Sequence, residues 1–587
     1  MFNVAHSLGG RAWRARDFDE RIARAIAEQH DLPFLIGRIL AARGVALDAV
    51  EGFLDPTLRR EMPDPSRLRD MDRAAGRIAD AIEGGEKIAL IADYDVDGAA
   101  SAALIARYLG AFGLAPAVHV PDRIREGYGP NAEALGRLVG DGARLIVTVD
   151  CGIAAADAFA AIAGRCDVIV LDHHQAGEEL PDIAGVVNPN RADDASGLGY
   201  LAAAGVVFLT LVAVSRELRR RGHFSGRGEP DLLGLVPLVA LATVCDVVPL
   251  AGLNRAFVAQ GLKLMRRRQF TGLVKLAERA RMSGPASVYH LGFLLGPRIN
   301  AGGRIGRSEL GYRLLSSDDG EAAEAIAAEL EALNAERQMI EAAALEEASA
   351  MVEAGETGSA RAPALVVASA NWHPGIVGLV AARLVERYRR PAVAIAIGED
   401  GQGRGSGRSI AGVDLGTAIR ACVGAGKLAR GGGHAMAAGL TLAAGDIAVF
   451  ADFLAARLAD QVALRADDNR LSIDGPLAAG GATRELMTLL ERAGPYGTGH
   501  AEPRFAFAAH RVAFAKTVGS GHVRASLRAE DGSTLDAIAF RAAGTPLGEA
   551  LCGGGARVLH VAGRLKRDHW QGRDAVQLMI EDAALPR

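Results

Sequence analysis

The sequence predicts an α/β protein of several domains, with a parallel sheet near its start and a small β-barrel at its end. Short apolar runs alternate with helical stretches from residue 87 onward, and short alternating segments fill the last 120 or so residues. A chain of 587 residues is too long for a single hydrophobic core. Half of the residues are apolar and 23% are charged, which is typical of a well-buried globular protein.

The parallel sheet follows from three similar units. The run KIALIA at 87–92 predicts a buried strand, followed by the loop DYDVDG and a helix. The runs RLIVTVDCGI and DVIVLDHH repeat this pattern, each ending in acidic or histidine residues. Ligands gather at the carboxyl ends of such strands, so we expect the functional residues there.

A long helix and a second, smaller α/β domain come next. The proline-free stretch from Ser317 places Ile326, Leu330 and Leu333 at helical spacing, which predicts one helix of about 30 residues, or 45 Å. We interpret this helix as a strut between two domains. The runs ALVVAS and PAVAIAI predict strands of the smaller domain, which also holds the Gly-rich segments GQGRGSGRS and KLARGGGHAMAAG. From about Arg465, short alternating segments predict the barrel.

Charge and cysteine content narrow the class of protein. The formal net charge of −4 gives no global attraction to a polyanion, so nucleic-acid binding would depend on local basic patches and metal ions. The five cysteines form no C-x-x-C pair, which indicates neither a zinc site nor a disulfide framework. The first thirty residues lack an apolar segment of the export type, and Pro237 interrupts the apolar stretch 232–249. We therefore expect a cytoplasmic protein without a membrane segment.

Three carboxylates on alternate positions form the strongest local signal. Asp93, Asp95 and Asp97 lie just past the buried strand 87–92, where they would repel one another without a cation. A calcium loop of the EF-hand type would need a trailing Glu and a preceding helix, and both are missing. Carboxylate-rich sites take hard divalent cations, so we favour a catalytic metal.

The next two strands and an apolar helix end in matching chemistry. Asp150 follows one strand, Asp172, His173 and His174 follow the next, and Asp246 follows the helix. Alone, each of them has an ordinary explanation as a helix cap, a core histidine or a turn former. Together they make the ligand set of a two-metal hydrolytic site, because strand ends of a parallel sheet converge on one crevice.

Two further segments are candidates for binding anions. Arginine forks match phosphate oxygens, and glycines allow a close backbone approach, although such segments can also be simple hinges. The candidate residues are Arg298, Asn300, Arg304, Arg404, Ser406, Arg408, Ser409, Gly432, Gly433 and His434.

The motifs DYDVDG, VDCGI, LDHH and CDVVPL appear in the order found in the DHH phosphoesterase superfamily, which the chain resembles over most of its length. GGGHAMAAG resembles the phosphate-binding motif of the accompanying DHHA1 domain, and PYGTGHAEPRF resembles the entry to the OB-fold domain of RecJ exonucleases. The resemblance implies five parts: a segment packing on the catalytic domain (1–69), the DHH catalytic domain (70–316), the connecting helix (317–355), a DHHA1 substrate clamp (356–464) and an OB-fold strand-binding domain (465–587).

The resemblance also implies roles for the site residues. Asp93 and Asp95 would bind one metal ion, Asp97, His173 and Asp246 the other, and Asp150 would bridge them. His174 would face the scissile phosphate as a catalytic residue beside Asp150. The two divalent ions would be Mn²⁺ by preference, with Mg²⁺ possible.

The implied activity is 5′-to-3′ exonuclease cleavage of single-stranded DNA to 5′-mononucleotides, in recombination and repair. The implied protein is a monomer that works near single-strand-binding protein and a helicase. Arg511, Lys516, Arg524 and Arg528 on the barrel are expected to contact the strand. Phe505, Phe507 and Phe514 could stack on bases, but alternate phenylalanines can equally fill a barrel core.

Three alternatives remain open from the sequence. The DHH and GGGH segments alone would suit an oligoribonuclease or a cyclic-dinucleotide phosphodiesterase, although such enzymes typically lack a barrel. An inorganic pyrophosphatase has similar acidic loops but no use for a strand-binding domain. A non-catalytic scaffold of the same fold could lose ligands freely, yet every expected acidic and histidine position is filled here.

Overall fold

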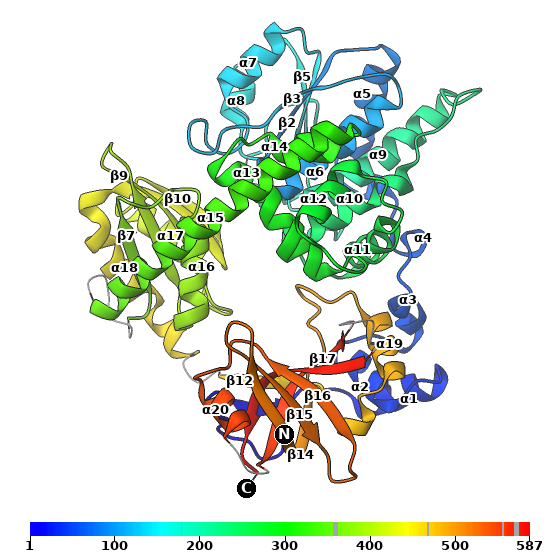
Figure 1. Ribbon diagram of the computed structural model, residues 1–587. Coiled ribbons are helices and arrows are strands. Elements are labelled where there is room, and N and C mark those ends of the chain that lie inside the picture. Colours follow the sequence, from blue (N-terminus) through cyan, green and yellow to red (C-terminus); the bar gives the residue numbers. More distant parts are fainter. Residues whose placement is uncertain (178, 356–361, 466–468, 554–556, 569–574, 587) are drawn as a thin grey trace. The chain divides into compact units, whose positions relative to one another are not determined.

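The computed structural model describes residues 1–177, 179–355, 362–465, 469–553, 557–568 and 575–586 (Figure 1). The chain forms two compact units. The barrel unit comprises Met1–Met62, Pro249–Ala259 and Asp468–Arg587. The sheet unit comprises Pro63–Val248 and Gln260–Asp467.

The sheet unit begins with the parallel sheet that the sequence predicts. Its five strands are all parallel and run in the order β3 (Ala117–His119), β2 (Ile88–Ala92), β4 (Leu145–Val149), β5 (Asp167–Leu171) and β6 (Gly185–Val187). Strands β2 and β4 are buried along their whole length, which explains their unbroken apolar sequences.

Helices cover both faces of this sheet (Figure 1). Helices α7 (Ala132–Gly140) and α8 (Ala156–Ala160) share a core with one face. Helices α5 (Met71–Glu83), α6 (Val96–Gly110) and α9 (Ala203–Arg220) pack on the other. With both faces covered, the carboxyl edge of the sheet is the place left for a ligand.

A group of helices extends the sheet domain. It consists of α10 (Leu232–Cys245), α12 (Thr271–Arg279), a π-helical turn η3 (His290–Leu295), α13 (Gly296–Ile305) and α14 (Leu310–Ser316). Helix α10 continues through Pro237, so this proline does not end it. Among the described residues, no helix is both long enough and apolar enough to cross a membrane.

The predicted strut is a single helix, α15 (Gly320–Ala354), of 35 residues. It packs against α12 and α13 of the sheet domain, and against α16 (Val377–Tyr388) and β7 (Leu365–Ser369) of the smaller domain. Between these contacts it buries three polar residues, Asn334, Arg337 and Glu341. The helix therefore joins the two domains through a polar centre.

The smaller domain has a mixed sheet in the order β10 (Arg430–His434), β11 (Ala437–Ala443), β9 (Gln402–Arg408), β8 (Ala392–Ile397) and β7. Helices α17 (Leu415–Gly424) and α18 (Ile447–Ala463) complete its core. The Gly-rich segments lie in strands, the first (401–409) in β9 and the second (427–439) in β10 and the start of β11. Their glycines allow close packing, since a Cβ on Gly407 would lie 2.7 Å from Leu415.

The barrel unit confirms the predicted OB-like barrel. Strands β14 (Phe505–Val518), β15 (His522–Arg528), β16 (Thr534–Ala539), β18 (Ala575–Ala584) and β17 (Val558–Asp568) are neighbours in that order, and β17 pairs with β14 to close the barrel. Helix α20 (Pro546–Cys552) lies between β16 and β17 in the chain. This closure leaves no free edge within the barrel.

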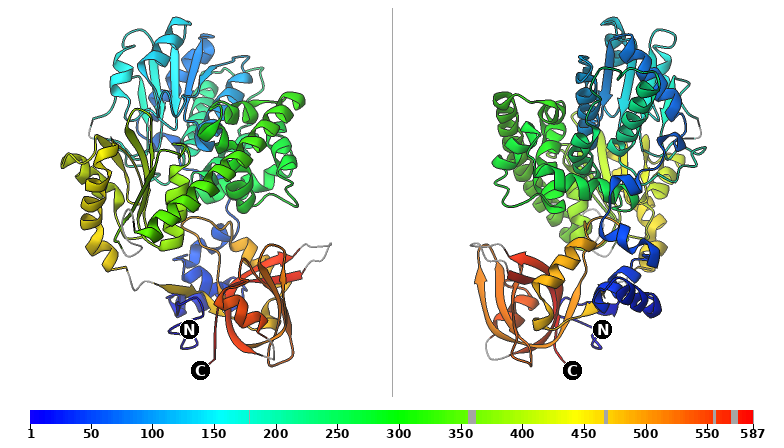
Figure 2. Two further views of the ribbon diagram at one scale, coloured as in Figure 1. Left: turned by 60° about the vertical axis from the view of Figure 1, so that its left-hand side comes forward. Right: turned by 90° about the vertical axis from the view of Figure 1, so that its right-hand side faces the viewer.

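Residues 1–62 of the N-terminal segment (1–69), which was expected on the catalytic domain, instead share a core with the barrel, whereas residues 63–69 belong to the sheet unit. Figure 2 shows its blue helices beside the orange and red barrel. Strand β1 (Ala12–Ala15) pairs with β12 (Arg470–Ile473), and helices α1 (Glu20–Gln29) and α2 (Phe34–Ala41) add apolar side chains to the barrel core. The buried Asp582 accepts a hydrogen bond of 2.9 Å from Trp13 Nε1. Apolar helix faces that the segment cannot bury alone explain this placement.

Two phenylalanines of β14 provide a test of the barrel core. Phe507 is fully buried, whereas Phe514 is 53% exposed. We expect Phe507→Ala to lower the free energy of unfolding of the barrel unit by about 3–5 kcal/mol, because it leaves a cavity. Phe514→Ala should change it by less than about 0.5 kcal/mol. Urea unfolding of the full chain measures both, and equal losses would contradict the assignment of β14 faces.

Candidate active site

Carboxylates and a histidine converge at the carboxyl edge of the parallel sheet. Asp93 follows β2, Asp150 follows β4, and Asp172, His173 and His174 follow β5. His173 Nε2 lies 3.3 Å from Asp150 Oδ1, 3.6 Å from Asp246 Oδ2 and 3.9 Å from Asp97 Oδ2. The structure thus brings together the acidic and histidine residues that the sequence singles out.

The turn after β2 explains how the first three aspartates are held. Asp95 is the N-cap of α6, and its side chain accepts hydrogen bonds from the N–H groups of Asp97 and Gly98 at 2.9 and 3.1 Å. Asp97 therefore stands in the first turn of α6 rather than in the expected loop. Gly98 allows the tight approach, since a Cβ there would lie 2.3 Å from the Asp93 carbonyl oxygen.

Asp97 and His173 are both fixed by the entry to α9. The two carboxylate oxygens of Asp97 accept hydrogen bonds from the N–H groups of Ala203 and Ala204 at 2.7 and 2.8 Å. His173 Nδ1 lies 3.0 Å from the carbonyl oxygen of Leu201. A proton donated along this contact leaves Nε2 as the free acceptor, the usual arrangement of a metal-binding histidine.

Asp172 orients its neighbours rather than facing the cluster. It accepts hydrogen bonds from the N–H groups of Ile153 and His173 at 3.0 and 2.7 Å, and it lies 2.8 Å from His174 Nδ1. Burial works to raise the pKa of Asp172, but the bonds and charge from His174 outweigh it and hold this pKa below its usual value. Asp172 is therefore an ionised anchor for the His174 ring.

Four buried atoms of the cluster have no hydrogen-bond partner among the described residues. They are Asp93 Oδ1, Asp150 Oδ1, Asp246 Oδ2 and His173 Nε2. Burial, and then mutual repulsion, raise the pKa of Asp93, Asp150 and Asp246, and raise the pKa of Asp97 to about 7. Burial lowers the pKa of His173 to about 4. Buried carboxylate oxygens and an imidazole nitrogen that lack a hydrogen-bond partner are suitable ligands for divalent cations.

The ligand atoms fall into three overlapping sets, and within each set they lie within 4.8 Å of one another. These sets are Asp93, Asp95 and Asp150; Asp97, His173 and Asp246; and Asp150, His173 and His174. Asp150 and His173 each belong to two of them, and Asp150 alone links the set of Asp93 and Asp95 to the histidines. The Asp150 backbone has φ 59°, an uncommon conformation for a residue other than glycine.

The comparisons with known proteins agree with this geometry. The chain matches the DHH family N-terminal domain over residues 87–236, the DHHA1 domain over 362–460 and the RecJ OB domain over 473–582. The single-stranded-DNA-specific exonuclease RecJ of Dickeya dadantii is 36% identical over 568 residues, which are 94% of this chain and 96% of that protein. The chain belongs to the RecJ family.

Two other members give the same result. RecJ of Bacillus subtilis is 34% identical over 98% of this chain and 71% of its own length. The crystal structure of RecJ from Thermus thermophilus in complex with Mn²⁺ superposes with a TM-score of 0.80 at 28% identity, over 98% of this chain and 80% of that one. The resemblance read from the motifs is confirmed over nearly the whole chain.

The chain also gathers arginines near its acidic cluster. Arg304 donates a hydrogen bond of 3.2 Å to the carbonyl oxygen of Gly375 in the smaller domain. Burial, and then the positive charges of Arg123, Arg337 and Arg408, lower the pKa of Arg304 to about 10. Arg408 donates to Ser406 Oγ at 2.9 Å. Like charges held this close provide a site for an anion.

The other predicted phosphate ligands have different surroundings. Arg298 forms an ion pair with Glu331 of α15, and Arg404 pairs with Asp400 at 3.0 Å. Asn300 Oδ1 accepts a hydrogen bond from the Val96 N–H at 3.1 Å, so it supports the turn that holds the aspartates. Ser409 is buried and donates to the Val413 carbonyl oxygen at 2.8 Å.

Glycines and a histidine of β10 complete the predicted set. The carbonyl oxygen of Gly433 accepts a hydrogen bond of 2.9 Å from Arg420. Gly433 has φ 143°, and a Cβ there would lie 2.3 Å from the Ala437 carbonyl oxygen. Gly432 has open space at its Cβ position, and His434 is exposed at the end of the strand. These two residues are therefore available to a ligand.

Sequence reasoning missed two residues of the segment between β3 and α7. The Arg123 guanidinium lies 5.1 Å from the centre of the Tyr94 ring. Tyr128 Oη donates to the Asp150 carbonyl oxygen at 2.9 Å and lies 3.1 Å from His174 Nδ1. The signal was available, because this segment leaves the carboxyl end of a strand in the same parallel sheet.

The four predicted strand-binding cations form cross-strand pairs on the barrel. Arg511 is opposite Arg528, and Lys516 is opposite Arg524, on strands β14 and β15. Phe514 lies in the same row, with the Lys516 ammonium 6.0 Å from its ring centre. Phe505 and Phe507 are buried in the core. One of the three phenylalanines therefore remains available for stacking, beside the four cations.

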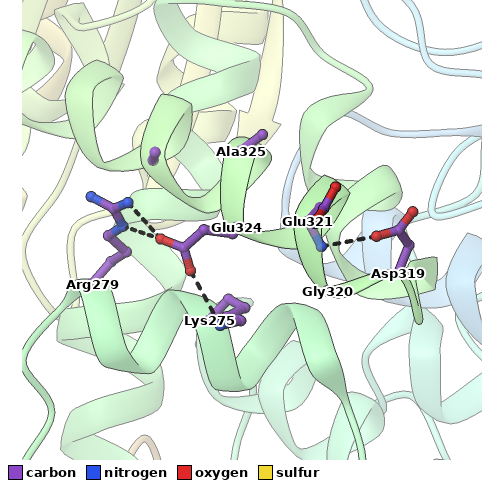
Figure 3. A pocket seen from close by; sticks show the side chains of 8 residues that line it. Lys275, Arg279, Asp319, Gly320, Glu321, Glu324 and Ala325 are labelled. Atoms are coloured by element: carbon purple, nitrogen blue, oxygen red, sulfur yellow. Dashed lines mark hydrogen bonds and ion pairs between the residues drawn. The ribbon is translucent and has the colours of Figure 1, made fainter.

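A hollow of about 600 Å³ lies away from this chemistry at the start of α15 (Figure 3). There Glu324 pairs with Arg279 at 2.5 Å and with Lys275 at 3.5 Å. Asp319 accepts a hydrogen bond of 2.8 Å from the Glu321 N–H at the helix start. Its charged groups satisfy one another, so this hollow lacks the orphaned atoms that mark the acidic cluster.

The raised pKa of Asp97 predicts how pH and metal act on stability. Its folded pKa of about 7 exceeds its usual 3.8, so the protonated form is favoured in the folded state. Without metal, this contribution is fully present below about pH 3.8 and is lost as pH rises through about 7. We expect Mn²⁺ to raise Tm more at pH 8 than at pH 5.5, where protons compete for the same oxygens.

Thermal unfolding of the full chain with Mn²⁺ or with EDTA at both pH values measures this difference. Asp97→Asn should reduce it, whereas the exposed Asp157→Asn on α8 is the matched control and should not. An equal Mn²⁺ effect at both pH values would contradict a carboxylate metal site.

Proposed function

We propose that this chain is a single-stranded-DNA-specific exonuclease that removes nucleotides from the 5′ end by metal-dependent hydrolysis of phosphodiester bonds. The observation that carries this proposal is the set of four orphaned, buried ligand atoms beside a cluster of arginines. Membership of the RecJ family over nearly the full chain supports the substrate class.

The three ligand sets support the assignment of two divalent ions. Asp93 and Asp95 would bind one ion, and Asp97, His173 and Asp246 the other, with Asp150 between them. RecJ of Thermus thermophilus was solved with Mn²⁺ and with Mg²⁺, which supports divalent ions at this site. We propose Mn²⁺ as the preferred ion and Mg²⁺ as an alternative. Bound there, such ions activate water, polarise phosphoryl oxygens and stabilise the leaving oxygen.

The protein groups around these ligands position the substrate. Asp172 and Tyr128 hold His174 at the edge of the cluster, facing the scissile phosphate. Arg304, Arg408 and Arg123 supply guanidinium groups for phosphate oxygens, with Ser406 and His434 nearby on the smaller domain. If this domain holds the terminal phosphate, the next diester lies at the aspartates, and cleavage proceeds from 5′ to 3′.

The domain boundaries and cellular setting belong to the same proposal. The DHH domain (70–316) would hold the metals, the helix (317–355) would set the spacing of the clamp (356–464), and the barrel (465–587) would bind the strand through its paired cations. We expect a cytoplasmic monomer acting in recombination and repair, near single-strand-binding protein and a helicase.

The barrel also separates this function from the alternatives. A match to the RecJ OB domain over 473–582 adds a strand-binding part that oligoribonucleotide and cyclic-dinucleotide phosphodiesterases, and pyrophosphatases, do not require. The filled ligand positions and their orphaned atoms argue against a non-catalytic scaffold.

The first test is digestion of 5′-phosphorylated single-stranded DNA, duplex DNA and matched RNA with Mn²⁺. We expect mononucleotides from the 5′ end of single-stranded DNA alone. Asp150→Ala should reduce the rate by more than about a hundredfold. Replacing a residue that only hydrogen-bonds to a metal ligand already lowers metal affinity or activity about 10–100-fold. Asp157→Ala, an exposed aspartate on α8, is the control. Cleavage only of dinucleotides or short RNA would refute the substrate class.

The second test concerns the 5′ phosphate. Arg408→Ala removes a guanidinium from the clamp, so the preference for a 5′-phosphorylated over a 5′-hydroxyl end should fall about tenfold. Arg404→Ala is the matched control on the same strand, because Arg404 already pairs with Asp400. Competition between the two ends measures the preference, and an unchanged ratio in Arg408→Ala would remove this residue from the clamp.

A further inference from the structure

The segment 120–131, which joins β3 to α7, brings two residues to the candidate site. Tyr128 Oη donates to the Asp150 carbonyl oxygen at 2.9 Å and lies 3.1 Å from His174 Nδ1. The Tyr128 and His174 rings also meet edge to face, with centroids 5.6 Å apart. The second residue is Arg123. We call this segment the β3–α7 loop.

Arg123 belongs to the arginine cluster beside the aspartates. Burial, and next the positive charge of Arg123, lower the pKa of both Arg304 and Arg408. The Arg123 guanidinium lies 5.1 Å from the centre of the Tyr94 ring, and within the described residues it forms no ion pair with a carboxylate. It is therefore placed to meet an anion at the cluster.

Between these two residues in the chain, Glu126 turns its carboxylate toward the ends of the loop. Glu126 Oε2 lies 2.9 Å from His119 Nε2 at the end of β3, and it accepts a hydrogen bond of 3.0 Å from Asn131 Nδ2 at the start of α7. Glu126 Oε1 accepts a hydrogen bond of 3.0 Å from the Asp122 N–H. Burial works to raise the pKa of Glu126, but these hydrogen bonds and the charge of His119 outweigh it and lower this pKa. One ionised carboxylate therefore ties both ends of the loop to its first turn.

The partners of Glu126 hold fixed places of their own. Asn131 is the N-cap of α7, where its Oδ1 accepts a hydrogen bond of 2.8 Å from the Ala134 N–H. Asp122 Oδ1 accepts hydrogen bonds of 2.8 and 2.9 Å from two N–H groups of the following turn, which is the turn that carries Arg123. Through these partners, Glu126 is connected both to the helix α7 and to the backbone around Arg123.

The stretch that carries Tyr128 needs such an anchor. Gly127 and Gly129 flank Tyr128 with φ 86° and 80°, in the left-handed region that favours glycine. Glycine loses more conformational freedom on folding than any other residue, so this stretch keeps one conformation only where contacts hold it. Glu126 supplies such contacts immediately before the first of the two glycines.

We infer that Glu126 is a positioning residue, which sets Arg123 to bind the 5′-terminal phosphate and Tyr128 to orient His174. The inference rests on the proposed function and gives the β3–α7 loop a part in it. Arg123 lies before Glu126 and Tyr128 lies after it, both within one turn of chain, so one set of hydrogen bonds fixes both. The carboxylate itself is occupied by its partners in the loop, and it acts on the substrate only through these two residues.

Digestion of matched 5′-phosphorylated and 5′-hydroxyl single strands by the full chain with Mn²⁺ tests this inference. The preference is the ratio of kcat/KM for the two ends in competition, which a partly unfolded sample does not change. Glu126→Ala should lower this preference about tenfold, because Arg123 loses its place at the phosphate. Glu126→Gln keeps one acceptor oxygen and should lower it less, about threefold.

The decisive quantity is the coupling between Glu126 and Arg123. Arg123→Ala alone should lower the preference about tenfold. Adding Glu126→Ala should lower it no further, because the guanidinium to be positioned is already gone. Glu133→Ala, which removes an exposed carboxylate from the first turn of α7, is the matched control and should keep the preference of the parent.

The 5′-hydroxyl strand isolates the part played by Tyr128, since this strand offers Arg123 no terminal phosphate. On it, Glu126→Ala should lower kcat about tenfold, because Tyr128 no longer holds the His174 ring in place. Tyr128→Phe should lower kcat to a similar extent, and the double variant should be no slower. Thermal unfolding in EDTA checks that each variant is folded at the assay temperature.

An unchanged preference in Glu126→Ala, or a loss that multiplies with that of Arg123→Ala, would overturn the inference. So would an Arg123→Ala chain that keeps the preference of the parent, since Glu126 would then have no phosphate contact to position. The proposed function is tested separately, by the parent chain. A parent that digests single-stranded DNA from its 5′ end, with variants that show no coupling, keeps its function and loses only this inference.

Discussion

The structure depends on holding several carboxylates together in a buried place. Each is fixed by groups of the protein itself: Asp95 by the first turn of α6, Asp97 by the N–H groups at the start of α9, and Asp172 by three backbone N–H groups. Helix starts carry partial positive charge, which offsets part of the repulsion. The oxygens that remain unpaired face one another, so the fold stabilises the aspartates only in part and leaves the rest of the charge to bound cations.

The buried arginines beside the acidic cluster also hold like charges close together, but of the opposite sign. Arg304 lies close to Arg123, Arg337 and Arg408, and burial with like charges lowers its pKa to about 10. Arg298 pairs with Glu331 and Arg337 pairs with Glu341, as arginines that serve the fold do. Within the described residues, Arg304 and Arg408 form no ion pair with a carboxylate. The carboxylates of the acidic cluster attract cations, and the guanidinium groups of the arginine cluster attract an anion. A phosphodiester bound to metal ions would neutralise the charge of both clusters. The two clusters are therefore best explained as one site.

The sequence predicts the sheet and its ligands because both are local properties. A strand buried on both faces has an unbroken apolar sequence, and a residue just past it lies at the carboxyl edge whatever the rest of the fold. Contacts between residues that are far apart in the sequence cannot be predicted in this way. Nothing near Arg298 shows that it meets Glu331, nor that the first 62 residues complete the core of a barrel that begins over 400 residues later. Arg123 and Tyr128 escaped notice because their segment contains no dense motif, although its place after β3 was informative.

Local charge, rather than net charge, explains how a chain of net charge −4 can belong to a family that acts on DNA. The positive groups occur in separate sets: the arginines beside the aspartates, and the cross-strand pairs on β14 and β15. In both sets an aromatic ring accompanies a cation, Tyr94 beside Arg123 in one and Phe514 beside Lys516 in the other. A surface that attracted phosphates everywhere would bind duplex and single strands alike, since both carry the same backbone charge. Cations confined to places that also offer a ring favour nucleotides whose bases are free, and this is the discrimination that a single-strand-specific enzyme requires.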